Sequence, residues 1–188
     1  QMLSKLGIHV PETRLIALGQ GKSAYLIKRF DRLPDQPIHF ISAHSLFNTD
    51  RVKLIPDARH DPRSYIALAG HLRAHSAEPA RDCHELYRRM VANVLLGNTD
   101  DHARNHAMLY DIKAGQWRLA PAYDMLPILG SRGQQALGIG TDGRASTIDN
   151  LLSASTAFGL SKDLALAYID HLSKGMSAWE DMFSQYGV

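Results

Sequence analysis

A polar stretch in the middle of the chain contains residue types that phosphoryl transfer requires. The stretch reads Gly97-Asn98-Thr99-Asp100-Asp101-His102-Ala103-Arg104-Asn105, and Tyr123-Asp124 follows further along. Phosphoryl transfer needs a carboxylate that accepts the proton of the attacking hydroxyl, and oxygen ligands that hold Mg²⁺ against the nucleotide phosphates. Asp100, Asn105 and Asp124 offer these groups.

The spacing of Asp100 and Asn105 matches the D-x-x-x-x-N pattern of the kinase catalytic loop, in which the Asp is the base and the Asn binds metal. The pattern is short and arises often by chance. An ordinary polar turn, with Asp124 as the N-cap of a short helix, explains the spacing about equally well. A buried helix, a polar loop, a hairpin and a further Asp in this order are rarer and favour the kinase interpretation.

The helix that should position this loop is predicted over about residues 82–96. Its apolar side chains recur at helical spacing and form a wide stripe: Leu86, Met90, Val91, Val94 and Leu95. Glu85, Arg88 and Arg89 are expected on the opposite, solvent-exposed side. Gly97 is expected to end the helix, because glycine readily adopts the left-handed conformation found there.

The remaining pattern predicts a mainly α chain with small β-hairpins. Two hairpins are predicted, from apolar runs on both sides of glycine-containing turns: residues 13–18 with 24–30, and residues 106–110 with 116–120. Residues 31–63 are expected to be irregular apart from a short helix. Helices are predicted at residues 2–8 (closed by Gly7), 41–47 and 64–76, from Ser146 or Thr147, and from Ser161. The core face of the last helix is expected to hold Leu164, Tyr168, Leu172, Met176, Trp179 and Phe183.

The composition is that of an ordinary globular protein. The chain has 188 residues, of which 45% are hydrophobic and 21% charged, with a formal net charge of +2. This balance does not indicate direct nucleic-acid binding. A single cysteine, Cys83, excludes an internal disulfide and fits a cytoplasmic location. No apolar run is long enough to span a membrane. The first residue is not Met, and the start reads like the middle of a helix, so a fragment or a processed chain is expected.

A family resemblance covers about residues 5–185. The phrase from Val94 to His106, followed by Trp117-Arg118-Leu119-Ala120-Pro121-Ala122-Tyr123-Asp124, resembles the signature of the HipA family, the serine/threonine kinase toxins of bacterial toxin–antitoxin systems. Val10-Pro11-Glu12 and residues 26–32 are similar to the segment that leads through the hinge between the two kinase lobes. The resemblance implies a protein-kinase-like C-lobe helical bundle with the N-lobe largely absent. Residues 1–32 would be the end of the N-lobe and the hinge, and residues 33–188 the C-terminal kinase lobe.

The resemblance also implies roles for individual residues. Asp100 is the general base, and Asn105 and Asp124 are the Mg²⁺ ligands. His102 orients the loop or touches phosphate, and Arg104 meets the transferred phosphoryl group.

The hinge residues Arg29 and Phe30 would border the adenine of ATP. Lys28 stands where the family often has an acidic residue. Met125-Leu126 replaces the Phe-Gly of ordinary protein kinases. The family's phosphate-binding loop and strand lysine are expected upstream of this sequence.

The implied activity is transfer of the ATP γ-phosphate to a serine of a protein, for example an aminoacyl-tRNA synthetase, which leads to growth arrest and persistence. The implied partner is a helix-turn-helix antitoxin (HipB-like) that contacts DNA, so this chain would meet DNA only through that partner. An aminoglycoside-type small-molecule phosphotransferase is an alternative, although Asn98-Thr99-Asp100 replaces the usual His-Gly-Asp. A non-catalytic, antitoxin-binding lobe is a third possibility.

Four other signals are weaker. Residues 19–23 (Gly-Gln-Gly-Lys-Ser) suggest a Walker A loop, but Ile16 stands where that motif needs glycine, so a hairpin turn is favoured. His71 and His75 have the spacing of zinc ligands, yet no further ligand accompanies them. Asp101-His102 resembles a metal-hydrolase pair, and this interpretation ranks below the kinase one. Cys83 opens a helix whose dipole would lower its thiol pKa, but a structural thiol is favoured.

Overall fold

The computed structural model describes residues 2–47, 57–128 and 133–177, and its elements form a mixed α/β protein with small sheets. The helices are α1 (Met2–Lys5), α2 (Ala43–Phe47), α3 (Tyr65–His75), α4 (Pro79–Leu96), α5 (Ile148–Ala154) and α6 (Lys162–Met176). Two short 3₁₀ helices are η1 (Ala103–Asn105) and η2 (Ser155–Phe158). Within the described ranges, no helix is both long and apolar enough to cross a membrane.

Seven strands in the described part of the chain form three antiparallel sheets. The strands are β1 (Thr13–Gly19), β2 (Lys22–Ile27), β3 (Arg32–Leu33), β4 (Gln36–Pro37), β5 (Phe40–Ser42), β6 (Ala107–Asp111) and β7 (Gln116–Leu119). β1 pairs with β2, β3 pairs with β4, and β5, β6 and β7 form a three-stranded sheet. Both predicted hairpins are therefore confirmed. The prediction of an irregular segment between them was too simple, because β3, β4 and β5 lie there.

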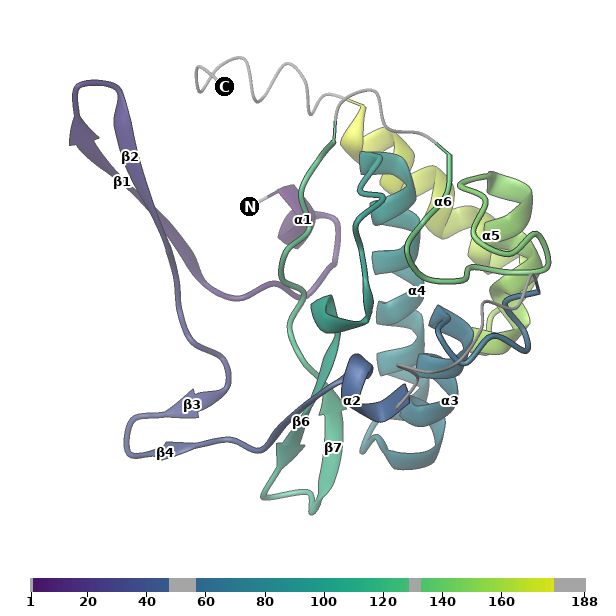
Figure 1. Cartoon of the computed structure of the whole chain (residues 1–188), viewed down its shortest axis with the longest axis horizontal. Coiled ribbons are helices and arrows are strands. Elements are labelled where there is room, and N and C mark those ends of the chain that lie inside the picture. The colour runs from purple at the N-terminus through teal and green to yellow at the C-terminus, as the bar shows by residue number, and fades with distance from the viewer. Residues whose placement is uncertain (1, 48–56, 129–132, 178–188) are drawn as a thin grey trace.

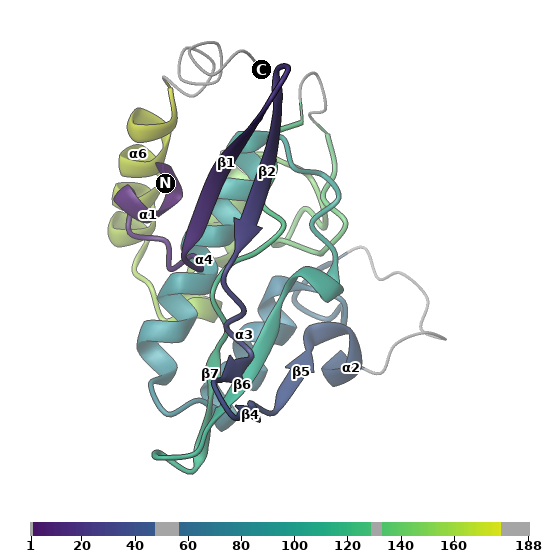
Figure 2. The same cartoon turned by 90° about the vertical axis from the view of Figure 1, so that its left-hand side faces the viewer.

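The β1–β2 hairpin stands away from the helices on the left of Figure 1, the side that faces the viewer in Figure 2. Gly19, Gln20 and Gly21 all have positive φ in its turn, which is the backbone of a tight hairpin rather than of a phosphate-binding loop. β2 ends at Ile27, so Arg29 and Phe30 follow the strand instead of lying in it.

The helices pack around α4, which contacts α3 and α6 (Figure 1). Local sequence signals fix several of their ends as predicted, although α4 begins at Pro79 instead of about residue 82 and α1 ends at Lys5. Gly97 ends α4 in the left-handed conformation with φ of 66°. The hydroxyls of Ser64, Thr147 and Ser161 accept backbone N–H groups of the first turns of α3, α5 and α6.

The prediction that Glu85 and Arg89 face solvent was wrong. Glu85 is 6% exposed and Arg89 is 1% exposed. Arg89 Nε donates to Glu85 Oε1 at 2.9 Å, and the backbone N–H of His9 donates to the same oxygen at 2.8 Å. The N-terminal segment covers this face of α4, so the helix is buried on more sides than its apolar stripe indicates. Arg88 remains partly exposed.

The core face of α6 is only partly as predicted. Leu172 and Met176 are fully buried, whereas Leu164 is 39% exposed. Ala165 and Ile169 are buried in its place, because they share the helix face of Leu172 and Met176. Tyr168 is half-buried. The predicted core positions 179 and 183 lie outside the described residues.

Cys83 is a structural thiol, as favoured. It is 1% exposed, and its Sγ lies 3.6 Å from the carbonyl oxygen of Ala69 as a weak donor. Burial raises the pKa of this thiol, which is opposite to the expected effect of the helix dipole.

We predict that Glu85→Gln lowers the free energy of unfolding by about 3 kcal/mol, because it leaves the Arg89 guanidinium buried without its counter-charge. Chemical denaturation measures the change. Asp170→Asn is a matched control, since it removes one side of the exposed Asp170–Lys174 pair and should cost less than about 1 kcal/mol. Equal losses in the two variants would contradict a special role for the buried pair.

The contribution of Glu85 to stability can also be tested by measuring the free energy of unfolding as a function of pH. Burial alone would raise the pKa of Glu85, but the charge of Arg89 and hydrogen bonds from Arg88 and His9 outweigh it and lower the pKa below 4.5. A lowered pKa in the folded state stabilises above the unfolded pKa, and this stabilisation is lost as the pH falls. The difference between the native protein and Glu85→Gln should therefore shrink below pH 4.5.

Candidate active site

The loop that carries the candidate residues leaves the C-terminal end of α4. Beyond Gly97, the Asn98 N–H donates to the Asn93 carbonyl at 2.9 Å, which closes the last turn of the helix. The chain then runs through residues 99–102 into η1. Asp100 is exposed, whereas Asp101 is 1% exposed. Two neighbouring carboxylates therefore lie in opposite environments.

Asn98 joins this loop to Asp124. Its side chain is 3% exposed, and its Nδ2 donates to Asn93 Oδ1 at 2.9 Å and to the Asp124 carbonyl at 3.4 Å. Asp124 has a left-handed backbone with φ of 59°. Asp tolerates this conformation better than most residues, and such geometry clusters at functional sites. The structure thus brings the backbone of Asp124 next to the start of the loop, as the order of sequence elements suggested.

A network of buried hydrogen bonds fixes the loop at Asp101. The hydroxyl of Tyr65 on α3 donates to Asp101 Oδ2, and Asn93 Nδ2 donates to that hydroxyl at 3.2 Å. His106 Nε2 lies 2.8 Å from the same Asp101 oxygen. Burial and then the charge of Asp101 raise the pKa of Tyr65 well above its ordinary value, so the phenol stays a donor.

The metal-hydrolase interpretation of Asp101-His102 gains no support from these contacts. Asp101 is bound by Tyr65 and His106 instead of His102. Among the described residues, no group of three or more His, Cys, Asp or Glu side chains is close enough to hold a metal ion. The same holds for His71 and His75, whose rings lie 6.4 Å apart on α3.

The carboxylates of Asp100 and Asp124 are exposed, and no residue within the described ranges gives either one a hydrogen bond or an ion pair. Asn105 is 6% exposed, and its Nδ2 lies 3.5 Å from the Asp100 carbonyl oxygen. This contact leaves the Asn105 side-chain oxygen for another partner. Two open carboxylates and one amide oxygen are the hard ligands that Mg²⁺ prefers, so the residue set fits that ion.

The other predicted residues lie around this centre. Arg104 is exposed, and its carbonyl accepts the Tyr123 hydroxyl at 2.8 Å. His102 is half-buried at the start of η1. Phe30 stacks on Tyr123 with ring centroids 5.5 Å apart, which links the predicted hinge to the residue before Asp124. Burial raises the pKa of Tyr123 to about 12, so its hydroxyl remains protonated.

Among the described residues, the Arg29 side chain pairs with Asp31 and makes no hydrogen bond or ion pair with Phe30, Tyr123 or the loop. Its Nε and Nη2 donate to the two oxygens of Asp31, at 2.6 and 2.5 Å, and both side chains lie at the surface. Lys28 pairs with Glu12 at 3.0 Å in the same way. The structure therefore places Phe30, but not the guanidinium of Arg29, in contact with the residues near Asp124.

Two hollows lie near the candidate residues. One of about 730 Å³ lies between β3–β4, α4 and the β6–β7 hairpin, with Phe30 in its wall, and it includes none of Asp100, Asn105 and Asp124. A smaller one of about 230 Å³ includes His102 and Arg104. Neither hollow includes the open carboxylates, but the smaller one contains His102 and Arg104 of the predicted site, whereas the larger one contains only Phe30.

The sequence did not reveal the supporting residues Tyr65, Asn93 and His106. Asn93 had one signal, since a short amide within an apolar helix calls for a partner. Tyr65 lies in the helix predicted over residues 64–76, whose pattern assigns no role to its hydroxyl. Its contact with Asp101 joins residues 36 positions apart in the sequence, so no local sequence pattern predicts this contact.

Comparison with known proteins places this arrangement in a family. The family described as HipA-like C-terminal domain matches residues 1–179. A protein of Sinorhizobium fredii named "Putative kinase Y4dM" is 31% identical over 132 residues, which are 64% of this chain and 30% of that protein. A Haemophilus influenzae protein named "Putative kinase" is 30% identical over 134 residues, 68% of this chain and 39% of that protein. The chain thus spans about a third of the length of these relatives.

Solved structures show the same fold. The HipA chain of a Shewanella oneidensis complex of HipA, HipB and operator DNA superposes with a TM-score of 0.71 at 18% identity, over 92% of this chain and 44% of that one. The Helicobacter pylori proinflammatory kinase CtkA gives a TM-score of 0.56 at 16% identity, over 94% of this chain and 78% of that one.

We predict that Asn98→Ala loosens the segment around Asp124 more than the rest of the protein. Loss of a buried hydrogen-bonding amide should cost about 1–3 kcal/mol. Amide hydrogen exchange should accelerate at Ile128, whose N–H donates to the Leu96 carbonyl at 3.1 Å. Exchange in the β1–β2 hairpin should not change.

Asn150→Ala is the matched control, because Asn150 is also a buried asparagine that bonds three backbone carbonyls, at Asp142, Gly143 and Ala145. It should destabilise its own loop and leave Ile128 exchange as in the native protein. If both variants changed Ile128 equally, Asn98 would have no specific link to Asp124.

Proposed function

We propose that this chain, which belongs to the HipA-like C-terminal domain family, forms the catalytic and metal-binding part of the active site of an ATP-dependent kinase. The observation that carries the proposal is that the buried amide of Asn98, two residues before Asp100, bonds the backbone carbonyl of Asp124, while the side chains of Asp100 and Asp124 both remain exposed. A purely structural turn has no need of two exposed carboxylates to which no described residue gives a hydrogen bond. A phosphotransferase needs both, because one must accept a proton and another must bind a cation.

The roles follow from the environments of the residues. Asp100 is the general base, because its carboxylate is exposed and accessible to an incoming hydroxyl. The hydrogen bond between Tyr65 and the buried Asp101 fixes the loop beside it. Asn105 and Asp124 hold Mg²⁺, which neutralises charge on the phosphates of ATP. Arg104, exposed on η1, meets the transferred phosphoryl group, and His102 supports the loop or touches phosphate.

The hinge residues take a smaller part. Phe30, stacked on Tyr123, borders the adenine. Arg29 borders it only if it leaves Asp31. The N-lobe elements that grip the nucleotide would belong to the rest of the protein, in keeping with a C-terminal lobe from residue 33 onward and a remnant of the N-lobe and hinge before it.

The substrate and partner are proposed from the family. The solved Shewanella relative is in complex with HipB and operator DNA. We assign this protein a HipB-like helix-turn-helix antitoxin as partner, and contact with DNA only through it. The acceptor is a serine of a cytoplasmic protein, such as an aminoacyl-tRNA synthetase, whose phosphorylation arrests growth.

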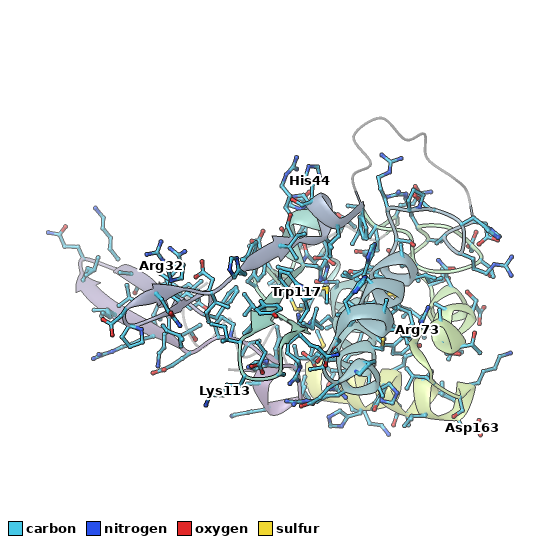
Figure 3. The ribbon with its side chains drawn as sticks, turned by 90° about the horizontal axis from the view of Figure 1, so that it is seen from below. Arg32, His44, Arg73, Lys113, Trp117 and Asp163 are labelled. Atoms are coloured by element: carbon cyan, nitrogen blue, oxygen red, sulfur yellow. The ribbon has the colours of Figure 1, made fainter. Side chains whose placement is uncertain are left out.

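We predict that Asp100→Asn, in the full-length protein, lowers phosphoryl transfer by about 10²–10⁴-fold, the usual contribution of a general base. ATP affinity should change little, because Asp100 is not a metal ligand. Transfer of labelled γ-phosphate to proteins measures the first, and calorimetry the second. Asp163→Asn is the control, since Asp163 is an exposed carboxylate in the first turn of α6, at the edge of the molecule in Figure 3. Near-normal transfer by Asp100→Asn would refute its role as base.

The same assay separates the alternative functions. Labelled phosphate on small alcohols such as aminoglycosides, and not on proteins, would identify a small-molecule phosphotransferase. Antitoxin binding without any transfer would identify a non-catalytic lobe.

We predict that the 188-residue chain alone binds Mg·ATP weakly and transfers no phosphate, because the chain spans about a third of its relatives' length and holds only the metal-binding side of the site. A calorimetric titration of the isolated chain measures this. A micromolar dissociation constant would contradict the prediction.

A further inference from the structure

A basic hollow lies on the α2 side of the catalytic loop. It has a volume of about 230 Å³ and is lined by His44, Arg63, His102, Ala103, Arg104, Ala136 and Leu137. Four of these side chains are basic and none is acidic. Figure 3 shows His44 on α2 at the edge of the molecule. The residues come from four different segments of the fold, so the hollow is not a product of one helix end.

Arg63 is the residue whose state calls for a ligand. Its Nε and Nη2 are shielded from solvent and have no hydrogen-bond acceptor in the described part of the chain. The nearest carboxylate, Asp61, lies 3.9 Å from Nε. Asp61 is already bound by Arg144 Nη2 at 2.9 Å and by the backbone N–H of Arg63 at 2.8 Å.

A guanidinium in this state is costly. The Arg63 side chain is 29% exposed and has Asp61 as a counter-charge, but its shielded N–H groups without acceptors lower stability. His102 adds a second polar atom, because its Nδ1 is also shielded and has no hydrogen-bond partner among the described residues. Arg63 and His102 would both gain from one group that brings negative charge and several acceptor oxygens. Planar guanidinium groups form bidentate hydrogen bonds with phosphate and carboxylate oxygens.

We propose that this hollow binds an anionic oxygen group, a phosphorylated or acidic side chain, that the protein substrate carries near its acceptor serine. The inference rests on the proposed function, since the hollow shares His102 and Arg104 with the proposed catalytic loop. In that function, Asp100 of the same loop would accept the proton of the serine hydroxyl. Arg63 is then a specificity residue. It lies outside the set proposed to hold the nucleotide and metal, and it selects substrates by charge.

The test uses the 188-residue chain without nucleotide, with inorganic phosphate and acetate as probes. Histidine ring resonances, observed by NMR, report binding at His102. We expect saturable shifts with millimolar phosphate, and a loss of affinity of about tenfold or more in Arg63→Gln, the size of one or two charge-assisted hydrogen bonds. Arg63→Lys should fall between, because it keeps the charge but loses the fork.

Arg59→Gln is the matched control. Arg59 is an exposed arginine paired with Asp57 outside the hollow, so its loss should leave phosphate affinity unchanged. Thermal unfolding checks that each variant is folded. Tighter binding of phosphate than of acetate would assign the hollow to phosphorylated side chains, and equal or tighter binding of acetate would assign it to acidic ones.

Two results would overturn the proposal: no saturable shift at His102 with either probe at tens of millimolar, or equal affinities in Arg63→Gln and the native chain. Neither would touch the kinase assignment, which depends on Asp100 and is measured by γ-phosphate transfer in the full-length protein. Conversely, phosphate binding that depends on Arg63 would stand even if Asp100→Asn kept its activity, and it would then describe an anion site without a kinase role.

Discussion

The structure depends on the buried polar face of α4. Four polar residues lie three or four positions apart on one side of this helix, and all are nearly inaccessible: Asp82, Glu85, Arg89 and Asn93. Asp82 accepts the Leu119 N–H at the end of β7, the Glu85–Arg89 pair holds the chain at His9, and Asn93 binds Asn98 of the loop. Because such groups are costly to bury without their partners, the three segments are fixed relative to one helix. The carbonyl of His9 in turn accepts the Ala122 N–H at 2.7 Å, two residues before Asp124.

This arrangement explains what could be predicted from the sequence and what could not. Helix ends were predictable, because caps such as Ser161 and the left-handed Gly97 act within one turn. The interior of α4 was not, because charge was equated with exposure at Glu85 and Arg89. Their burial depends on a segment 76 residues or more away. The two-residue strands β3 and β4 are too short to show a period at all.

In the candidate site, too, the features set by local sequence could be predicted and those set by long-range contacts could not. Asp100, Asn105 and Asp124 could be picked out because their residue types and spacing are local. Their support could not, because it comes from α3, from α4 and from His106, the residue before β6. The neighbours Asp100 and Asp101 illustrate the difference. They are chemically alike, yet the network binds Asp101 and leaves Asp100 open, so the buried member gives rigidity and the exposed one can react.

The segment predicted to be the hinge is held more loosely than the loop at the end of α4. The β1–β2 hairpin exposes much of its apolar surface, with Leu15 59%, Leu18 65% and Tyr25 62% exposed, and a two-stranded hairpin has little stability of its own. It still reaches the loop, because Phe30 just beyond it stacks on Tyr123, whose hydroxyl bonds the Arg104 carbonyl. Any contact that fixes the hairpin therefore also acts on η1. In a kinase that closes around ATP, this route would couple the nucleotide side to a catalytic loop that α4 already holds in place.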